Sequence, residues 1–133
     1  MTFAGINYLA TVVAAVASWL LGAAWYSALG KHWMAALGKT KADLVPSPRP
    51  FVIAFVAQLV MAWMLAGVIG HMGQVTTPNG LVSGAFVWLG FVITVLAVNH
   101  GFQGHKLDLT AIDGGHWLAV LLVQGAIIGA FGT

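Results

Sequence analysis

The chain has 133 residues, of which 60% are hydrophobic and 6% charged, and its formal net charge is +2. Soluble domains carry about 25% charged residues, so this sequence cannot cover the surface of a water-soluble protein. The absence of cysteine excludes disulfides, thiolate zinc sites and iron–sulfur clusters. The composition predicts one domain, residues 1–133, whose main solvent is lipid, and the small basic excess does not indicate a nucleic-acid partner.

Four apolar runs are each long enough to cross a bilayer, which takes about 20 helical residues. They cover residues 7–29, 51–72, 80–99 and 111–131. Backbone polar groups inside a bilayer must be paired within the protein, and continuous apolar runs pair them as helices. We therefore predict an all-α membrane protein with four transmembrane helices in a compact bundle.

The first connection is rich in lysine, and its apolar residues recur at regular intervals. In LGKHWMAALGKTKADLV, residues 29–45, Trp33, Leu37 and Leu44 recur at helix-like intervals with lysines between them. This pattern suits a short helix lying in the membrane interface, and a solvated basic loop is the alternative. The prolines of PSPRP then predict an extended segment that enters the membrane at Phe51.

Every lysine and arginine falls on one side of such a bundle. The first connection holds Lys31, Lys39, Lys41 and Arg49, and the third holds Lys106. The second connection and both terminal tails hold neither residue type. By the positive-inside rule, the first and third connections are cytoplasmic. We expect a multi-pass protein of the cell inner membrane with both termini periplasmic or external.

Each span carries small residues at intervals of four, which allow helices to pack closely in lipid. Gln58 and Gln124 are polar groups within the spans, and an interhelical hydrogen bond is favoured over a pore or ligand contact. The pair Gly125 and Gly129 could also dock a second copy, which predicts a homo-oligomer, a dimer or trimer. The small residues are Ala10, Ala14, Ser18 and Gly22, then Ala54, Ala62, Ala66 and Gly70, then Gly80 and Gly84, then Gly125 and Gly129.

The stretch NHGFQGHKLDLTAIDGGHW, residues 99–117, gathers three of the five histidines and two of the three acids. One interpretation is a capped helix start, in which Thr110 and Asp113 satisfy the first amides of the fourth span. The other is a ligand site at the cytoplasmic end of the bundle. Its candidate ligand-binding residues are Trp25, Tyr26, Asn99, His100, Asp113 and His116.

Metal binding is a weaker variant of the site hypothesis. His100, His105, Asp113 and His116 offer donors that suit zinc, nickel or non-haem iron. Haem held between His100 and His116 is chemically feasible. Their spacing matches no known motif, so no metal and no cofactor are expected.

The sequence WLLGAAWYSALGKHWM resembles a family of small bacterial integral membrane proteins, domain of unknown function 1761. The family signature Trp-Tyr-Ser is matched here by Trp25 to Ser27, and its Gly-x-x-Trp is matched by Gly30 and Trp33. The final stretch LTAIDGGHWLAVLLVQGAIIG is similar to the family's closing pattern. Ala28 stands where a proline often follows in the family. The resemblance implies about four spans over essentially the whole chain, and it implies no activity.

The function predicted from these features is a non-enzymatic membrane component that associates with itself or with another protein. The alternative is a protein that handles a small molecule, a lipid or a metal ion through the cytoplasmic polar residues. A nucleophilic enzyme has little support, because Ser27 has no evident base and orienting partner in the sequence. Proton-coupled export is disfavoured because the spans carry no charge at mid-depth.

Overall fold

The structure is a computed structural model that describes residues 6–133, and these residues form helices and no strands. Four helical segments are long and apolar enough to cross a membrane, as the sequence predicts. The first is α1, Tyr8–Leu37, and the second is α2, Arg49–Met72. The third span consists of α3, Thr77–Val87, a π-helical turn η3, Trp88–Val92, and α4, Ile93–Phe102. The fourth is α5, Leu107–Phe131.

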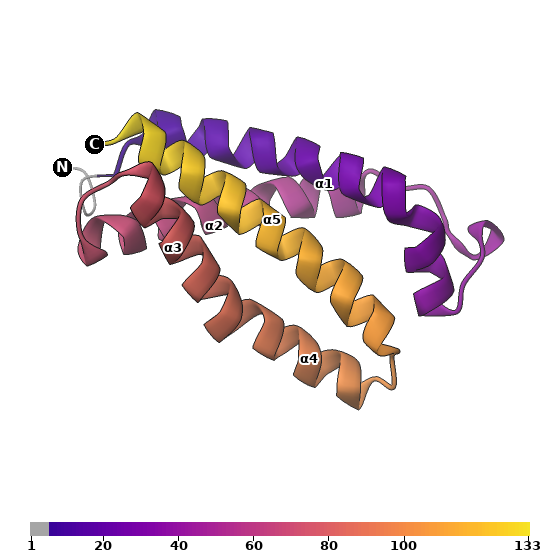
Figure 1. The fold of residues 1–133 in the computed structure, drawn as a ribbon. Helices are drawn as coiled ribbons and strands as arrows, with labels where there is room; N and C mark the ends of the chain where they lie inside the picture. Colours follow the sequence, from indigo (N-terminus) through magenta and orange to yellow (C-terminus); the bar gives the residue numbers. More distant parts are fainter. Residues whose placement is uncertain (1–5) are drawn as a thin grey trace.

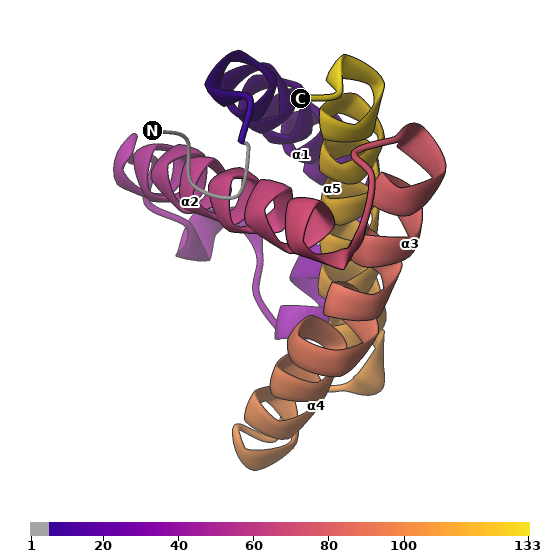
Figure 2. The ribbon, with the colours of Figure 1, turned by 90° about the vertical axis from the view of Figure 1, so that its left-hand side faces the viewer.

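The helices run alternately up and down between two ends of a bundle (Figure 1). The start of α1 and the end of α5 share one end with the α2–α3 connection, and the other two connections share the opposite end. α5 lies between α1 and the α3–α4 span, while α2 runs obliquely to α5 (Figures 1 and 2). All lysines and the arginine therefore belong to the end that holds the α1–α2 and α4–α5 connections.

Glycines let α3 and α5 touch along their backbones. A Cβ atom at Gly84 would lie 2.6 Å from the carbonyl oxygen of Leu121, and one at Gly80 would collide with the backbone of Gly125. Gly129 is equally close to the backbone of Thr76. The prediction that Gly125 and Gly129 dock a second copy is therefore wrong, because α3 of the same chain already covers them.

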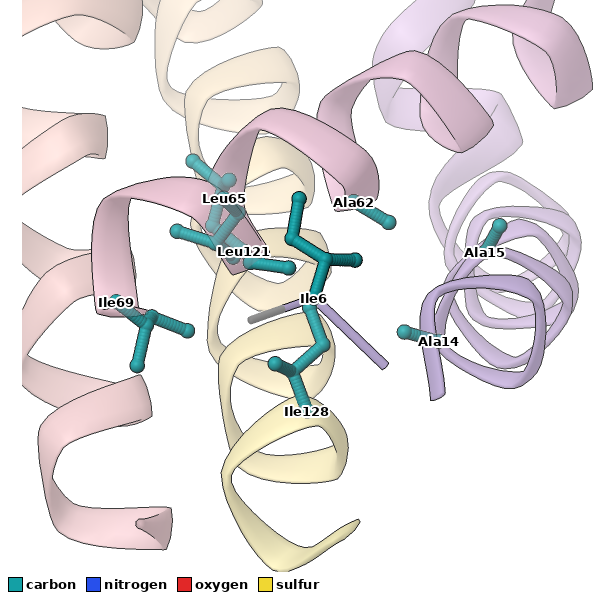
Figure 3. Close-up of a cluster of buried hydrophobic side chains, with 9 residues drawn as sticks. Ile6, Ala14, Ala15, Ala62, Leu65, Ile69, Leu121 and Ile128 are labelled. Atoms are coloured by element: carbon teal, nitrogen blue, oxygen red, sulfur yellow. The ribbon is translucent and has the colours of Figure 1, made fainter. Parts of the chain in front are cut away.

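The apolar core gathers buried side chains from α1, α2 and α5 and from Ile6, which precedes α1 (Figure 3). Alanines of α1 and α2 leave space there for larger side chains from α2 and α5, which is how close helix packing excludes voids. The buried residues labelled in Figure 3 are Ile6, Ala14, Ala15, Ala62, Leu65, Ile69, Leu121 and Ile128.

A buried set of hydrogen bonds ties three helices together beside this core. The Ser18 hydroxyl donates to Gln58 Oε1 at 2.7 Å, and Gln124 Nε2 donates to Ser18 Oγ and to the Gln58 carbonyl oxygen, both at 3.1 Å. All three side chains are buried. The predicted interhelical role of Gln58 and Gln124 is thus confirmed. We call these three residues the glutamine network.

The basic end differs from the predicted boundaries. α1 continues past Gly30 to Leu37 and ends at Gly38, whose φ of 72° closes the helix in the left-handed conformation. The residues expected to form an interfacial helix are therefore divided between the end of α1 and a short 3-10 turn, η2, Lys41–Asp43. α2 begins at Arg49 with Pro50 in its first turn, where a missing amide hydrogen costs nothing.

Candidate functional site

Asp113 lies inside α5 and does not cap it. Gly104 turns the chain with a φ of 73°, Lys106 is the residue before the helix, and α5 begins at Leu107. Thr110 and Asp113 therefore follow the first turn instead of forming it. The capped-start interpretation of these two residues is wrong, because the helix starts earlier than the apolar pattern indicates.

The Asp113 carboxylate joins side chains from two other helices. The Tyr26 hydroxyl of α1 donates to Asp113 Oδ1 at 2.6 Å. His100 of α4 directs Nε2 toward Asp113 Oδ2 at 3.8 Å, with side chains 11% and 19% exposed respectively. The short contact is a charge-assisted hydrogen bond when the carboxylate is ionised. The longer one is an ion pair only when the imidazole is protonated.

The other nitrogen of His100 is also engaged. His100 Nδ1 lies 2.8 Å from Thr110 Oγ1, and the rings of His100 and His105 meet edge to face at 5.6 Å. Protonated His100 would donate from both nitrogens, to Thr110 and toward Asp113. We call Tyr26, His100, Thr110 and Asp113 the polar cluster.

His116 lies next to the polar cluster but deeper in the protein. It is 5% exposed, and its ring is 5.0 Å from the ring of Tyr26. A Cβ at Gly22 would lie 2.9 Å from His116 Nε2, so the glycine is needed to admit the imidazole. His116 Nδ1 is buried without a hydrogen-bond partner. Such a group is uncommon in proteins and calls for a functional or structural explanation.

Two tryptophans hold the α5 backbone at this level. Trp25 Nε1 of α1 donates to the Ile112 carbonyl at 3.1 Å, and Trp88 Nε1 donates to the Gly114 carbonyl at 2.8 Å. Gly115 makes room for a ring, since a Cβ there would lie 2.9 Å from Trp25 Cζ2, and a Cβ at Gly114 would lie 2.6 Å from Ile93 Cδ1. The GG of the sequence DGGHW thus admits an aromatic side chain from α1 and an aliphatic one from α4.

The structure therefore brings most of the predicted site residues together. Trp25, Tyr26, His100, Asp113 and His116 meet where α1, α4 and α5 adjoin, and His105 touches His100. Asn99 does not join them, because it is exposed on α4.

The metal hypothesis finds no suitable geometry in the described part of the chain. Within residues 6–133, no group of three or more His, Cys, Asp or Glu side chains is arranged to hold a metal ion. Ser27 is exposed and donates its hydroxyl to the Ala23 carbonyl of its own helix at 2.6 Å.

The sequence does not predict two contacts of this region. They are the hydrogen bond from Trp88 to the Gly114 carbonyl and the contact of Thr110 with His100 in place of a helix cap. The only available signal was the unusual Gly114–Gly115 pair within an apolar run, which marks a close approach of neighbouring atoms.

Residues 9–129 match the family described as Protein of unknown function (DUF1761). The chain belongs to this family. The match covers all the residues of the polar cluster and confirms the resemblance noted at Trp25 to Ser27. No curated protein and no solved structure matches the chain.

Proposed function

We propose that this family member is a non-enzymatic, multi-pass component of the bacterial inner membrane that binds a small cation or hydrogen-bond donor at the polar cluster. The observation that carries the proposal is the position of Asp113, inside a membrane-spanning helix and linked to α1 and α4. Ionisable residues within membrane spans are rare, usually face the bundle interior and mark binding or transport pathways.

The surroundings favour a small ligand with positive character. Asp113 supplies carboxylate oxygens, and the buried, unpartnered His116 Nδ1 supplies a further polar atom nearby. Aromatic rings of Trp25 and Tyr26 flank His116, with centroids 6.5 Å and 5.0 Å away. Ring faces attract cations, most strongly where water is excluded.

Ligand binding can be tested through thermal stability, because a ligand that binds only the folded state raises the unfolding free energy. Purified wild type, Asp113→Asn and the control Asp43→Asn would be unfolded with Na⁺, K⁺, NH₄⁺, Zn²⁺ or Ni²⁺. Elemental analysis, visible absorption and native mass spectrometry would report copurifying species. We expect one cation to stabilise the wild type in a saturable manner. Its apparent affinity should be at least tenfold weaker in Asp113→Asn and unchanged in Asp43→Asn. Equal responses in all three proteins, or none, would refute the proposal.

Self-association is a second candidate, favoured by the outer face of α4. Thr94 and Asn99 are exposed on this face and line a shallow depression of about 300 Å³. A polar amide facing lipid gains from hydrogen bonding to another helix, by about 0.6–2 kcal/mol. We propose a dimer or trimer formed through this face.

The oligomeric mass in mild detergent and in nanodiscs tests this second candidate. Asn99→Leu should lower the fraction of oligomer, whereas Gln103→Leu, an exposed amide in the α4–α5 connection, should not. A monomeric mass for the wild type in several detergents and in lipid would exclude self-association.

A further inference from the structure

A groove separates the last turns of α1 from the first turns of α5 at the basic end of the bundle. Its volume is about 370 Å³. Charged and polar side chains line it, namely His32 of α1, Lys106 directly before α5 and Asp108 of α5, together with the apolar Leu29, Ala36 and Ile112. These residues are distinct from the polar cluster.

The length of α1 places this groove at the level of lipid headgroups. A helix of 30 residues is about 45 Å long, whereas the hydrocarbon core of a bilayer is about 30 Å thick. Part of α1 therefore lies outside the hydrocarbon. Lys31 in the later part of α1 and Lys39 just after it are both exposed, as expected for side chains in the interface, so we assign the excess length to this end.

The groove offers opposite charges two residues apart. The Lys106 ammonium can bind a phosphate, which the positive end of the α5 dipole also attracts. Asp108 presents a carboxylate on the same groove, where a purely anionic headgroup would be repelled. A zwitterionic headgroup satisfies both groups, because its phosphate meets Lys106 while its ammonium meets Asp108.

We propose that the groove is a binding site for one phosphatidylethanolamine molecule. The headgroup phosphate binds Lys106 with His32 as an additional donor, and the primary ammonium binds Asp108. The acyl chains leave along the apolar side of the groove, over Leu29 and Ile112. The proposal goes beyond the proposed function and does not depend on it, since it uses none of the residues of the polar cluster.

The test compares lipid retention by native mass spectrometry after release from nanodiscs of equal phosphatidylethanolamine and phosphatidylglycerol content. Wild type should retain one phosphatidylethanolamine in preference to phosphatidylglycerol. Lys106→Gln should lower its occupancy about fivefold, the effect of one cation near a lipid phosphate. The matched control Lys41→Gln removes an exposed charge outside the groove and should have no effect. Asp108→Asn should shift the preference toward phosphatidylglycerol.

Ala111→Trp provides a second variant, because Ala111 lines the groove and is exposed, so a large side chain fills the groove without entering the core. It should abolish retention while leaving the helical circular dichroism unchanged. Equal losses in Lys106→Gln and Lys41→Gln would overturn the proposal in favour of unspecific attraction. Retention by Ala111→Trp, or a wild-type preference for phosphatidylglycerol, would overturn it too. Asp113→Asn should retain the lipid, which separates this outcome from that of the cation test.

Discussion

Asp113 is the residue on which the arrangement of the basic end depends most directly, because its carboxylate contacts α1 and faces α4. Removing a donor from a buried acceptor costs more than the net value of the hydrogen bond, since the acceptor loses its solvation without replacement. The partners of Asp113 therefore contribute to stability as well as to any ligand binding.

Tyr26→Phe should destabilise the protein by about 1–2 kcal/mol, as it removes the 2.6 Å donor to Asp113 and keeps the ring. Reversible unfolding in mixed micelles would measure this loss. Ser27→Ala is the neighbouring control, because its exposed hydroxyl bonds only within α1. Equal unfolding free energies for the two variants would contradict the assigned role of Tyr26.

Asp43 lies outside the spans, in the α1–α2 connection, and its contact with Thr40 should depend on pH. The backbone N–H of Thr40, at 2.8 Å, and then its hydroxyl hold the pKa of Asp43 below its usual value, with a further contribution from Lys39. Because the folded pKa is the lower one, the contact is present above the unfolded pKa of about 3.9 and is lost as pH falls through the folded value.

The Thr40 amide proton shift, followed by NMR, should report this titration. Its midpoint should lie below about 3.9, and Asp43→Asn should remove the titration. A midpoint at or above that value would show that the Thr40 contact does not form in solution.

Which residues gather at the basic end could be predicted, because two connections bring Trp25, Tyr26 and the histidines to the same depth. Which atoms pair could not. Pairing depends on how each helix is rotated about its axis, and the sequence carries no direct record of that rotation. Thr110 illustrates the difficulty, since its hydroxyl suits a helix cap in sequence and contacts His100 in the structure.

Among the helices, α3 and α5 make the closest approach, and it depends on glycine. Gly84→Ala should force them apart and destabilise the protein by about 1–3 kcal/mol, as overpacking does. Gly101→Ala in the same span has open space around its Cβ and should be neutral or slightly stabilising. Thermal unfolding of both variants tests this, and equal midpoints would show that α3 and α5 can separate without cost.

The π-helical turn η3 holds one residue more than the corresponding stretch of α-helix. Deleting the exposed Leu89 should therefore convert the turn to α-helix and leave His100 facing Thr110. Deleting both Leu89 and Gly90, which are exposed, should remove one residue more and rotate α4 by about 100°, the angle of one residue, so that His100 faces away from Thr110.

Crosslinking can detect this rotation, since the chain has no native cysteine. A His100→Cys, Thr110→Cys pair should react with a short thiol crosslinker in the parent chain and after deletion of Leu89 alone, and should lose most of that reaction after deletion of both Leu89 and Gly90. Loss of crosslinking after deletion of Leu89 alone would show that η3 does not absorb an extra residue.

The small-residue faces of the spans were predictable, because close packing in lipid requires them and they recur every four residues. Ala10, Ala14, Ser18 and Gly22 are all buried, and so are Gly80, Gly84, Gly125 and Gly129. The surfaces that pack against these faces could not be predicted, because the spacing of small residues is the same whether the neighbour is another helix of the chain or a second copy. The π-helical turn has no residue signature either, since WLGFV suits an α-helix equally well.

For the molecule as a whole, the one-sided placement of lysine and arginine predicts the orientation in the membrane. Periplasm-dependent alkaline phosphatase should be active when fused to either terminus, and a cytoplasm-dependent fluorescent protein should be active after Lys39 or Lys106. If a cytoplasm-dependent reporter were active when fused to either terminus, the topology would be the inverse of the predicted one. The proposed lipid site would then face the outer leaflet.

The fold class followed from composition and run length alone, because few structures other than a helix bundle can shield four such runs in lipid. The oblique course of α2 could not be anticipated, since it depends on where the glutamine network and the alanines of α2 meet their neighbours (Figure 2). The phospholipid groove likewise arises from the length of α1 past Gly30, which the apolar pattern does not reveal.

The bond between Tyr26 and Asp113 joins residues 87 positions apart, in the first and last spans. A ribosome adding about 5–20 residues per second needs roughly 4–17 seconds to make the intervening chain. During that interval, α1 lies in the bilayer with Ser18 and Tyr26 lacking their α5 partners. α5, which is synthesised after the other three described spans, is therefore the helix that completes the hydrogen bonding of α1. A chain truncated before α5 should be recognised by membrane quality control as unfinished.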